Sequence, residues 1–463
     1  MPEEFSAPRR FGLAAGSARE LAYQVLRDSR ESGQWPSELL DERLDAAGLT
    51  AQDRGLTREL VFGVVRREDT LDALLRKLVK RPREAMEEEL WLLLQLGVYQ
   101  IALMPGMAHH AAVHETVELA RRAGRVRWTG FVNGVLRGAT RLVTNEPVTE
   151  PGPDALPVGA GFLRLNEPVF ADPATEPAAY LAAAASFPEW LIARWLKFAD
   201  WRQVLGWTQW FNQPPTLTAR VNGLRTTRDE LLAAWQAAGM QVRPGPHPSS
   251  ILVDSGPRVE EWPGFAEGWF TVQDLAAMAA ATRLAPEPGQ DVWDVCAAPG
   301  AKSCHLAELM QNHGTLIASD LQARRLNRID ENSRRLGLSI IRSMLVSAGG
   351  HDLPRGPFHR VLVDVPCGNT GVLGKRPEAR WRITPEGIAD LTMIQRRLLA
   401  DALARTNVGG RVLYSTCSID PEENTAVVHS TIDHNPRFRL IEEVTLWPGQ
   451  PADGAYQALI ERV

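Results

Sequence analysis

Residues 294–302 read Asp294-Val295-Cys296-Ala297-Ala298-Pro299-Gly300-Ala301-Lys302, a small-residue turn that follows the apolar run Val292 to Val295. A strand, such a turn and a helix in this order are typical of an α/β sheet that binds a ligand at the carboxyl ends of its strands. Small side chains let the backbone approach a ligand, and the helix start offers free amides. The turn matches neither G-x-G-x-x-G nor G-x-x-x-x-G-K-S/T, which disfavours dinucleotide and nucleoside-triphosphate sites. An ordinary tight turn without a ligand stays an alternative.

The chain around this turn alternates apolar strands with amphipathic helices. The predicted strands are Val292 to Val295, Leu316 to Ala318, Val361 to Val363 and Val412 to Tyr414. This alternation predicts a doubly wound parallel sheet, Rossmann-like, over residues 286–463. Asp320 ends the second strand, where a carboxylate can accept hydrogen bonds from both ribose hydroxyls. A cofactor with adenosine but no essential phosphate fits this pattern best, which indicates S-adenosylmethionine.

The residues before the sheet divide into three predicted parts. Residues 1–145 have helical spacing throughout, opened by the capping-box sequence Ser17 to Glu20, and predict an all-α bundle. Residues 146–170 are rich in proline and glycine and predict an extended linker. Residues 171–285 mix helical patterns with short strands and predict a small α+β region.

Composition limits the class of protein. A chain of 463 residues, 44% hydrophobic and 23% charged, predicts two or three globular domains. No apolar run approaches the roughly 20 residues of a membrane span, and residues 1–10 lack the apolar segment of a secretory signal. The four cysteines include no C-x-x-C pair, so we expect a reducing, cytoplasmic location and no metal site. The net charge of −5 neither requires nor excludes a nucleic-acid partner.

Two cysteines follow predicted strand ends. Cys367 lies in Asp364-Val365-Pro366-Cys367-Gly368-Asn369-Thr370-Gly371 and Cys417 in Tyr414-Ser415-Thr416-Cys417-Ser418-Ile419. Both exits belong to the edge of the sheet where the cofactor is expected, and nearby cations such as Lys302 or Lys375 would favour a thiolate. Asp364, three residues before Cys367, should reach the same pocket. Cys304 is interpreted as a packing residue, and Cys296 as a packing residue that offers its main-chain amide.

Two thiols beside a methyl donor suit the C5 atom of a pyrimidine, which is a poor nucleophile. A thiolate that adds to C6 makes C5 enamine-like and able to accept a methyl group. Asp364, if protonated or paired with the ring edge at N3, would orient cytosine and stabilise the developing charge. The adduct then loses its C5 proton and eliminates the thiolate, a step in which a second cysteine has a role. Methylation of an exocyclic amine needs no thiol.

Several motifs resemble RNA cytosine-5 methyltransferases of the RsmB/Sun (Fmu) or NOL1/NOP2 type. They are Asp364-Val365-Pro366-Cys367, the Cys417 segment, Pro421-Glu422-Glu423-Asn424, Trp269-Phe270-Thr271-Val272-Gln273-Asp274, Arg376-Pro377-Glu378-Ala379-Arg380-Trp381 and the cofactor turn. The resemblance implies that Cys417 is the nucleophile and that Cys367 assists product release. It implies cofactor contacts by Cys296, Ala297, Ala298, Pro299, Gly300, Ala301, Lys302, Asp320 and Asp364.

The helical part is similar to the NusB-like domain fused to bacterial small-subunit rRNA members of this family. The matching segments are Asp53-Arg54-Gly55-Leu56, Glu59 to Arg66, Leu96 to Gln100 and Gly130 to Arg137. The chain departs from the family pattern at Val365, usually alanine, and at Ala301, usually glycine. The acidic residue expected at the third strand end for adenine has two candidate positions, Ser347 and Asp352.

Basic residues mark candidate RNA contacts. Arg121, Arg122, Arg125, Arg127, Arg137 and Arg141 have no acidic residue between them, a pattern also typical of a solvated helix face. Lys375, Arg376, Arg380 and Arg382 follow Cys367 and would grip phosphates beside a flipped base, or else form a mobile charged loop. His109 and His110 are interpreted as bundle residues, since no metal-ligand spacing surrounds them.

The sequence thus predicts a monomeric S-adenosylmethionine-dependent cytosine-5 methyltransferase acting on small-subunit (16S) ribosomal RNA. A transfer RNA methyltransferase with the same chemistry is one alternative. A non-catalytic NusB-like RNA-binding or ribosome assembly factor is another.

Overall fold

The computed structural model describes residues 16–433, 435–449 and 451–463. Residues 1–15, 434 and 450 lie outside this description, and so does the prediction made for residues 1–10. The chain forms two compact units, Met1–Asn212 and Gln213–Val463. Each unit is described by itself.

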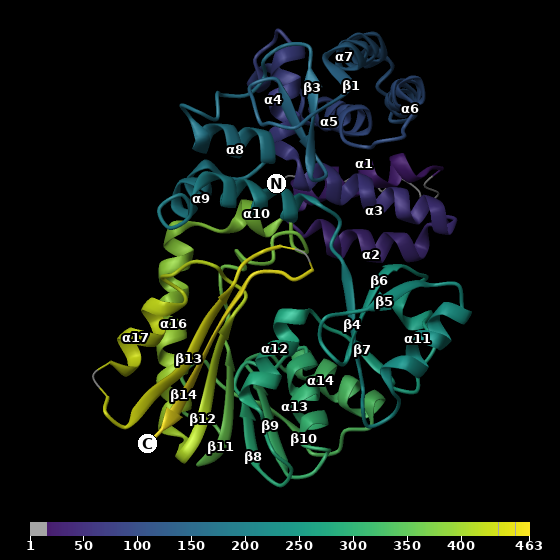
Figure 1. Cartoon of the computed structure of the whole chain (residues 1–463). Helices are drawn as coiled ribbons and strands as arrows, with labels where there is room; N and C mark the ends of the chain where they lie inside the picture. The colour runs from purple at the N-terminus through teal and green to yellow at the C-terminus, as the bar shows by residue number, and fades with distance from the viewer. Residues whose placement is uncertain (1–15, 434, 450) are drawn as a thin grey trace, which may run out of the picture. The chain divides into compact units, whose positions relative to one another are not determined.

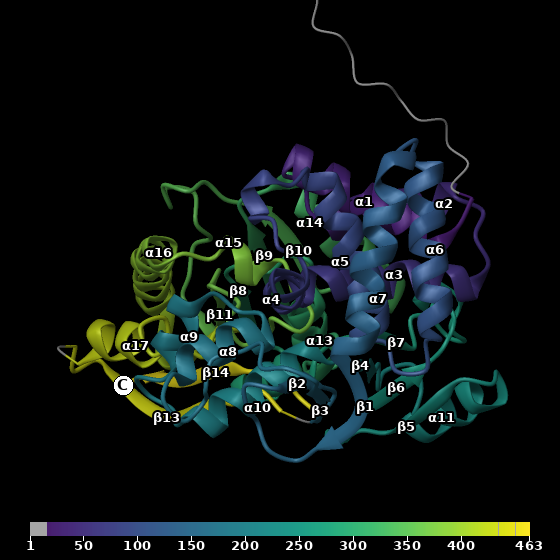
Figure 2. The same ribbon diagram turned by 90° about the horizontal axis from the view of Figure 1, so that it is seen from above.

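The first unit begins with a helical bundle, as predicted. Its helices are α1 (Ala18–Ser32), α2 (Pro36–Ala46), α3 (Ala51–Arg66), α4 (Glu68–Leu78), α5 (Glu88–Ala102), α6 (His109–Arg122) and α7 (Thr129–Leu142), with short 3₁₀ turns η1 (Arg83–Ala85) and η2 (Val126–Trp128). Ser17 caps α1, and its side chain accepts a hydrogen bond from the Glu20 amide. Every residue of α5 from Leu90 to Ala102 is buried, which makes α5 the central helix. Helices α6 and α7 run side by side (Figures 1 and 2).

The predicted linker over residues 146–170 is wrong. The structure has three antiparallel strands there, in the order β1 (Val143–Val148), β3 (Gly161–Leu165) and β2 (Ala155–Val158). Pro147 and Pro157 lie in the two outer strands, where a residue without an N–H is tolerated. Leu156 and Phe162 are both buried, and the register places them on opposite faces of the sheet, because Leu156 pairs with Leu163 and Phe162 with Pro157.

The predicted boundary near residue 170 is also wrong. Helices α8 (Pro177–Ala185), α9 (Glu189–Trp195) and α10 (Trp201–Asn212) belong to the first unit, which ends at Asn212. Arg67 explains this arrangement in part, because its guanidinium donates to the carbonyl oxygens of Pro157 (2.8 Å) and Ala184 (3.2 Å). These bonds join the helical bundle to both β2 and α8.

The second unit opens with a small four-stranded antiparallel sheet. Its strand order is β5 (Gln241–Pro244), β6 (Ser250–Ser255), β4 (Leu217–Val221) and β7 (Phe270–Val272). Helix α11 (Arg228–Ala237) packs on this sheet, η3 (Val259–Glu261) precedes β7, and Trp235, Trp262 and Phe270 fill the core between them. The α+β character predicted here is confirmed.

The rest of the second unit is a seven-stranded sheet with Rossmann-like order. The strands in spatial order are β10 (Ile341–Leu345), β9 (Thr315–Asp320), β8 (Asp291–Asp294), β11 (Phe358–Asp364), β12 (Thr406–Thr416), β14 (Ala455–Arg462) and β13 (Phe438–Leu446). Five strands, from β10 to β12, are parallel, but β14 is antiparallel to both its neighbours. The prediction of a fully parallel sheet is therefore wrong at this edge. Strands β13 and β14 form an antiparallel pair there, and such a pair can be connected without a crossover helix.

Helices cover both faces of this sheet (Figure 1). On one face lie α12 (Leu275–Leu284), α13 (Ala301–Leu309) and α14 (Ala323–Leu336), and on the other α16 (Pro385–Ala404) and α17 (Thr425–Ile432), while the short α15 (Ala379–Arg382) precedes α16. Strand residues alternate accordingly, with Leu362 and Leu413 in the first core and Val363 and Tyr414 in the second. From β8 the chain continues to β9 on one side of the sheet, whereas from β11 it continues to β12 on the other side. The strand order therefore reverses between β8 and β11, and in folds of this type ligands bind at such a reversal.

Candidate functional site

The predicted cofactor turn lies at this point of reversal. Strand β8 ends at Asp294, and the Ala297 amide donates to the Ser319 carbonyl oxygen (2.9 Å), which fixes the turn against β9. Gly300 has a φ of +98°, and a Cβ atom there would lie 3.2 Å from the Cα atom of Ile329. A side chain at residue 300 would therefore be strained by this backbone conformation and would press against α14. The segment Ala297 to Pro299 carries no long side chain and leads to the start of α13 at Ala301.

Asp294 is a residue of this site that the sequence reasoning did not select. Its side chain is 1% exposed, and its Oδ2 atom accepts a hydrogen bond from the Ser303 hydroxyl (2.6 Å). Its buried Oδ1 atom has no hydrogen-bond partner among the described residues. Burial raises the pKa of Asp294 to about 7. The signal in the sequence was an acidic residue at the end of an otherwise apolar strand.

Asp320 ends β9, as expected. It is 4% exposed, its Oδ1 atom accepts from the Gln322 amide (3.1 Å), and its Oδ2 atom lies 3.4 Å from Arg325. Arg325 also donates to the Ala298 carbonyl oxygen (2.9 Å), which connects Asp320 to the cofactor turn. Ser347 and Asp352, the two candidates for the adenine-binding position at the third strand end, are hydrogen-bonded to each other. The Asp352 carboxylate accepts from the Ser347 amide (2.7 Å) and from the Ser347 hydroxyl (2.8 Å).

These residues fit the expected cofactor. A buried carboxylate oxygen without a partner suits the ammonium of the methionine part of S-adenosylmethionine, and Asp320 suits the ribose hydroxyls. The glycine-dependent turn leaves room for the backbone to approach it. Cys296 follows Asp294 in the turn, and burial raises the pKa of its thiol, so it is not an activated nucleophile.

The structure brings the two cysteines together. The sulfur atoms of Cys367 and Cys417 lie 3.0 Å apart, and both residues are free thiols. Cys417 also donates to the Oδ1 atom of Asn369 (3.2 Å), whose side chain donates in turn to the Cys367 carbonyl oxygen (2.9 Å). Cys367 is buried, and its hydrogen bond with Cys417 together with that burial raises its pKa well above the usual thiol range.

Cys417 lines a pocket of about 230 Å³, and Lys302, Asp364, Asn369 and Arg376 line it too. Cys367 is not part of the pocket wall. The Lys302 ammonium donates to the Oδ2 atom of Asp364 (2.7 Å). Burial alone would lower the pKa of Lys302, but Asp364 and the neighbouring Cys417 outweigh it, so this pKa lies above its usual value. The pocket thus presents a thiol, a cation and a carboxylate on one side.

A buried polar network holds the two cysteine loops against each other. The Thr370 hydroxyl donates to the Oδ2 atom of Asp420 (2.6 Å) and lies 2.9 Å from the Ser418 hydroxyl. The Gly371 amide donates to the Cys417 carbonyl oxygen (2.9 Å). These hydrogen bonds connect the Cys367 loop directly to the Cys417 loop.

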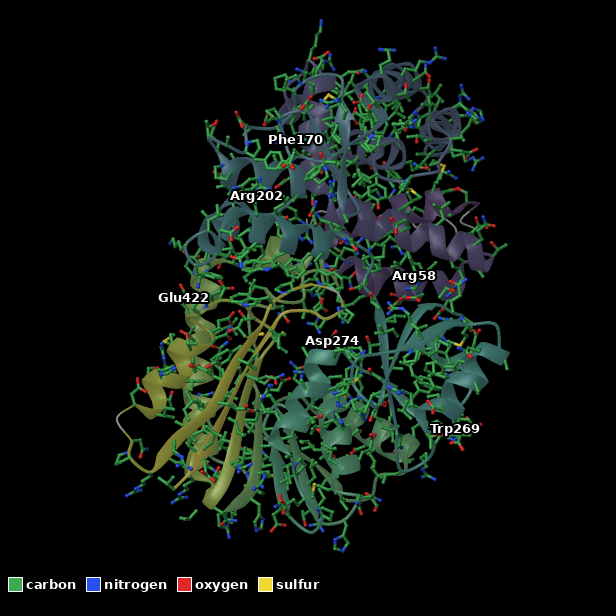
Figure 3. The ribbon with its side chains drawn as sticks, viewed as in Figure 1. Arg58, Phe170, Arg202, Trp269, Asp274 and Glu422 are labelled. Atoms are coloured by element: carbon green, nitrogen blue, oxygen red, sulfur yellow. The ribbon has the colours of Figure 1, made fainter. Side chains whose placement is uncertain are left out.

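The basic residues that follow Cys367 differ in their burial and in their hydrogen-bond and ion-pair partners. The Lys375 ammonium lies between the carboxylates of Asp274 (2.6 Å) and Asp453 (2.9 Å), and Figure 3 shows Asp274 at the amino-terminal end of α12. Both carboxylates compete with any RNA phosphate for Lys375. The prediction for Arg380 is wrong, because its side chain is fully buried and donates to the Leu373 carbonyl oxygen (3.3 Å). Arg376 is exposed at the pocket.

The arginines of the first unit also differ, since some pair with acidic residues and others are exposed or line a groove. Arg125 pairs with Glu89 (2.5 Å) and Arg127 with Glu87 (2.8 Å), acidic residues that lie far away in the sequence. Arg122 is exposed on α6. Arg121 lies on a groove of about 570 Å³ between α6 and α7, whose polar lining is His109, His110, His114, Glu118, Arg121, Asn133, Arg137 and Thr140. We call this surface the α6–α7 groove.

Two kinds of feature are absent from the described residues. No group of three or more histidine, cysteine, aspartate or glutamate side chains in this part of the chain has a geometry that could hold a metal ion. Within the same residues, no helix has the length and hydropathy that a membrane span requires.

Comparison with known proteins gives matches along most of the chain. Three family models match: the NusB family over residues 16–141, the ferredoxin-like domain of RsmF/B-like methyltransferases over residues 187–260, and the 16S rRNA methyltransferase RsmB/F over residues 281–456. The crystal structure of PH0851 is similar in fold, with a TM-score of 0.75 and 22% identity, covering 98% of this chain and 100% of that one.

Two curated relatives match at greater identity. A probable ribosomal RNA small subunit methyltransferase B of Synechocystis sp. is 33% identical over 91% of this chain and 90% of the relative. The ribosomal RNA small subunit methyltransferase B of Salmonella agona is 33% identical over 94% of this chain and 93% of the relative. With the NusB-like bundle, the ferredoxin-like sheet and the Rossmann-like cofactor site in one chain, the protein belongs to the RsmB/F family of S-adenosylmethionine-dependent rRNA methyltransferases.

Proposed function

We propose that this methyltransferase modifies the C5 atom of a cytosine in small-subunit (16S) rRNA through a covalent adduct with Cys417. The observation that carries the proposal is the pair of cysteine sulfurs 3.0 Å apart, of which only Cys417 reaches the pocket. An activated thiol is needed at C5 of a pyrimidine and unnecessary at an exocyclic amine.

Charges around the two sulfurs favour these unequal roles. The Lys302 ammonium lines the same pocket as Cys417 and interacts with it electrostatically. At Cys367 the hydrogen bond with Cys417, burial and, to a smaller extent, the Glu423 carboxylate raise the pKa well above the usual thiol range.

In the proposed reaction the Cys417 thiolate forms a bond to C6, and the C5–C6 π electrons move to C5. When bound, S-adenosylmethionine supplies the methyl group that C5 takes. The C5 proton then passes to water, the C5–C6 double bond forms again, and the C6–S bond breaks to return the thiolate. The Asp364 carboxylate orients cytosine at its N3 edge by accepting a hydrogen bond from the adjacent exocyclic amino group, and Lys302 holds that carboxylate in place (2.7 Å). The cofactor contacts we propose are Asp294, residues 296–302 and Asp320.

We propose that the α6–α7 groove contacts the RNA backbone. Arg121 and Arg137 line it together with three histidines, and Glu118, which pairs with Arg121, is its single acidic lining residue among those described. Cationic side chains along a groove supply salt-dependent affinity for phosphates. Arg376 would add a contact beside the reacting base.

The test is methylation of 16S rRNA by wild-type protein, with the modified nucleotide identified by mass spectrometry. The proposal expects 5-methylcytosine in rRNA and none after Cys417→Ala. Methylation of transfer RNA alone would favour the alternative substrate. Protein that binds rRNA but neither binds S-adenosylmethionine nor labels RNA would favour the assembly-factor alternative.

A further inference from the structure

Glu423 is a buried carboxyl behind the two cysteine loops that no step above uses. Its side chain is fully buried, and its Oε1 atom accepts from the Gly368 amide (2.8 Å) and from the Gln395 side-chain amide (2.9 Å). Its own carbonyl oxygen accepts from the Tyr414 hydroxyl (2.6 Å). Three parts of the fold, β12, α16 and the Cys367 loop, therefore meet at this residue.

Gln395 and Glu423 form hydrogen bonds with the residues directly before and after Cys367 in the chain. Gln395, which is fully buried on α16, donates from the same nitrogen to the Pro366 carbonyl oxygen (2.9 Å). The residue before Cys367 is thus fixed by Gln395 and the residue after it by Glu423. With both neighbours held, the direction in which the Cys367 side chain leaves the backbone is set.

We propose that Glu423 is a positioning residue for Cys367, holding the Pro366–Gly368 segment so that the Cys367 thiol reaches the Cys417 sulfur during product release. This inference rests on the proposed covalent mechanism. As the C6–S bond breaks, the electron pair stays on the Cys417 sulfur, and the Cys367 S–H donates a hydrogen bond to it across the observed 3.0 Å. The Glu423 carboxyl exchanges no proton in this step.

Two substitutions separate the anchoring by Glu423 from its charge. Burial raises the pKa of the Glu423 carboxyl, although hydrogen bonds from Ser418, Gly368 and Gln395 act against that rise. A glutamine carries no charge and keeps an oxygen that can accept from the Gly368 amide, whereas alanine leaves that amide buried and unpaired. Glutamine and alanine at this position therefore separate the effect of anchoring from the effect of charge.

The experiment measures the covalent protein–RNA adduct and the rate of turnover on 16S rRNA. Glu423→Ala should raise the adduct fraction about tenfold and lower kcat and KM together by about tenfold, while kcat/KM stays within about twofold, as expected when only a step after methyl transfer is slowed. Glu423→Gln should restore most of the release. Glu422→Ala is the matched control, because Glu422 is its exposed neighbour in the chain (Figure 3), and this variant should match the wild type.

A double variant tests whether Glu423 acts through Cys367. If it does, Glu423→Ala combined with Cys367→Ala traps no more adduct than Cys367→Ala alone, because both changes remove the same contact. Binding of S-adenosylmethionine by calorimetry confirms that each variant is folded. If Glu423→Ala binds the cofactor yet releases product at the wild-type rate, or adds further to the Cys367→Ala defect, the inference is wrong. Continued methylation by Cys417→Ala would instead overturn the covalent mechanism itself.

Discussion

The sulfur of Cys417 lies 3.0 Å from the sulfur of Cys367, although 50 positions separate them in the chain. The contact follows from the sheet, because β11 and β12 are parallel neighbours and Asp364 pairs in register with Ser415. Each cysteine follows its strand end by a few residues, so both loops leave the sheet at one edge. What distinguishes the two thiols is their surroundings, with the pocket and Lys302 on one side and Glu423 on the other.

Replacement of Cys417 by alanine should lower methyl transfer to 16S rRNA by at least about 10³-fold, since no other thiol lines the pocket. Transfer of a radiolabelled methyl group to rRNA measures this directly. Cofactor affinity should stay within a few-fold of wild type, which separates lost chemistry from lost folding. Methylation near the wild-type rate would contradict the role assigned to Cys417.

Replacement of Cys367 by alanine should have the opposite signature. Methyl transfer proceeds, but the departing Cys417 sulfur loses its hydrogen-bond donor 3.0 Å away, so protein should remain attached to RNA. Denaturing electrophoresis with labelled RNA reveals the adduct as a shifted band. The Cys304→Ala variant is a suitable control, because Cys304 is a buried core residue of α13 and should give no such band.

The pKa of Asp294 gives a pH dependence of stability. This pKa rises from 3.8 to about 7 in the folded protein, so between these values the native state keeps a proton that the unfolded state has lost. Stability should therefore fall as pH rises from about 4 to 7 and level off above, by at most about 4 kcal/mol from this group. Urea unfolding at several pH values, compared with Asp294→Asn, isolates the contribution. An identical pH profile in the variant would show that Asp294 titrates normally.

A buried ion pair connects the small sheet to the cofactor helix. Arg220 on β4 donates to both carboxylate oxygens of Glu308 on α13 (2.6 and 3.0 Å) and lies 3.1 Å from the Ala301 carbonyl oxygen. Glu308→Gln would leave a buried guanidinium without its counter-charge and should cost about 3–5 kcal/mol of unfolding free energy. Denaturant unfolding measures this cost, and a change below about 1 kcal/mol would mean that the pair is dispensable.

Local patterns predicted the central strands β8, β9, β11 and β12, because continuous apolar runs such as Val361 to Val363 report burial directly, but they missed β1 to β3, β10, β13 and β14. They did not predict partners distant in the chain. The pairing of Lys375 with Asp274 and Asp453 depends on three segments that only the fold brings together. Likewise, Arg380 appears basic and available in the sequence, whereas the turn into α15 directs it inward.

The α6–α7 groove makes a prediction about RNA affinity. Arg121→Ala combined with Arg137→Ala removes two cations from the groove lining and should weaken binding of rRNA fragments at low salt. The slope of log K against log salt should become shallower by about 0.7 per lost phosphate contact for single-stranded RNA. Arg127→Ala is the comparison, because Arg127 is equally basic but pairs with Glu87 (2.8 Å) outside the groove. If the Arg127 variant lost as much affinity as the double variant, RNA binding would depend on the total positive charge of this surface and not on the α6–α7 groove.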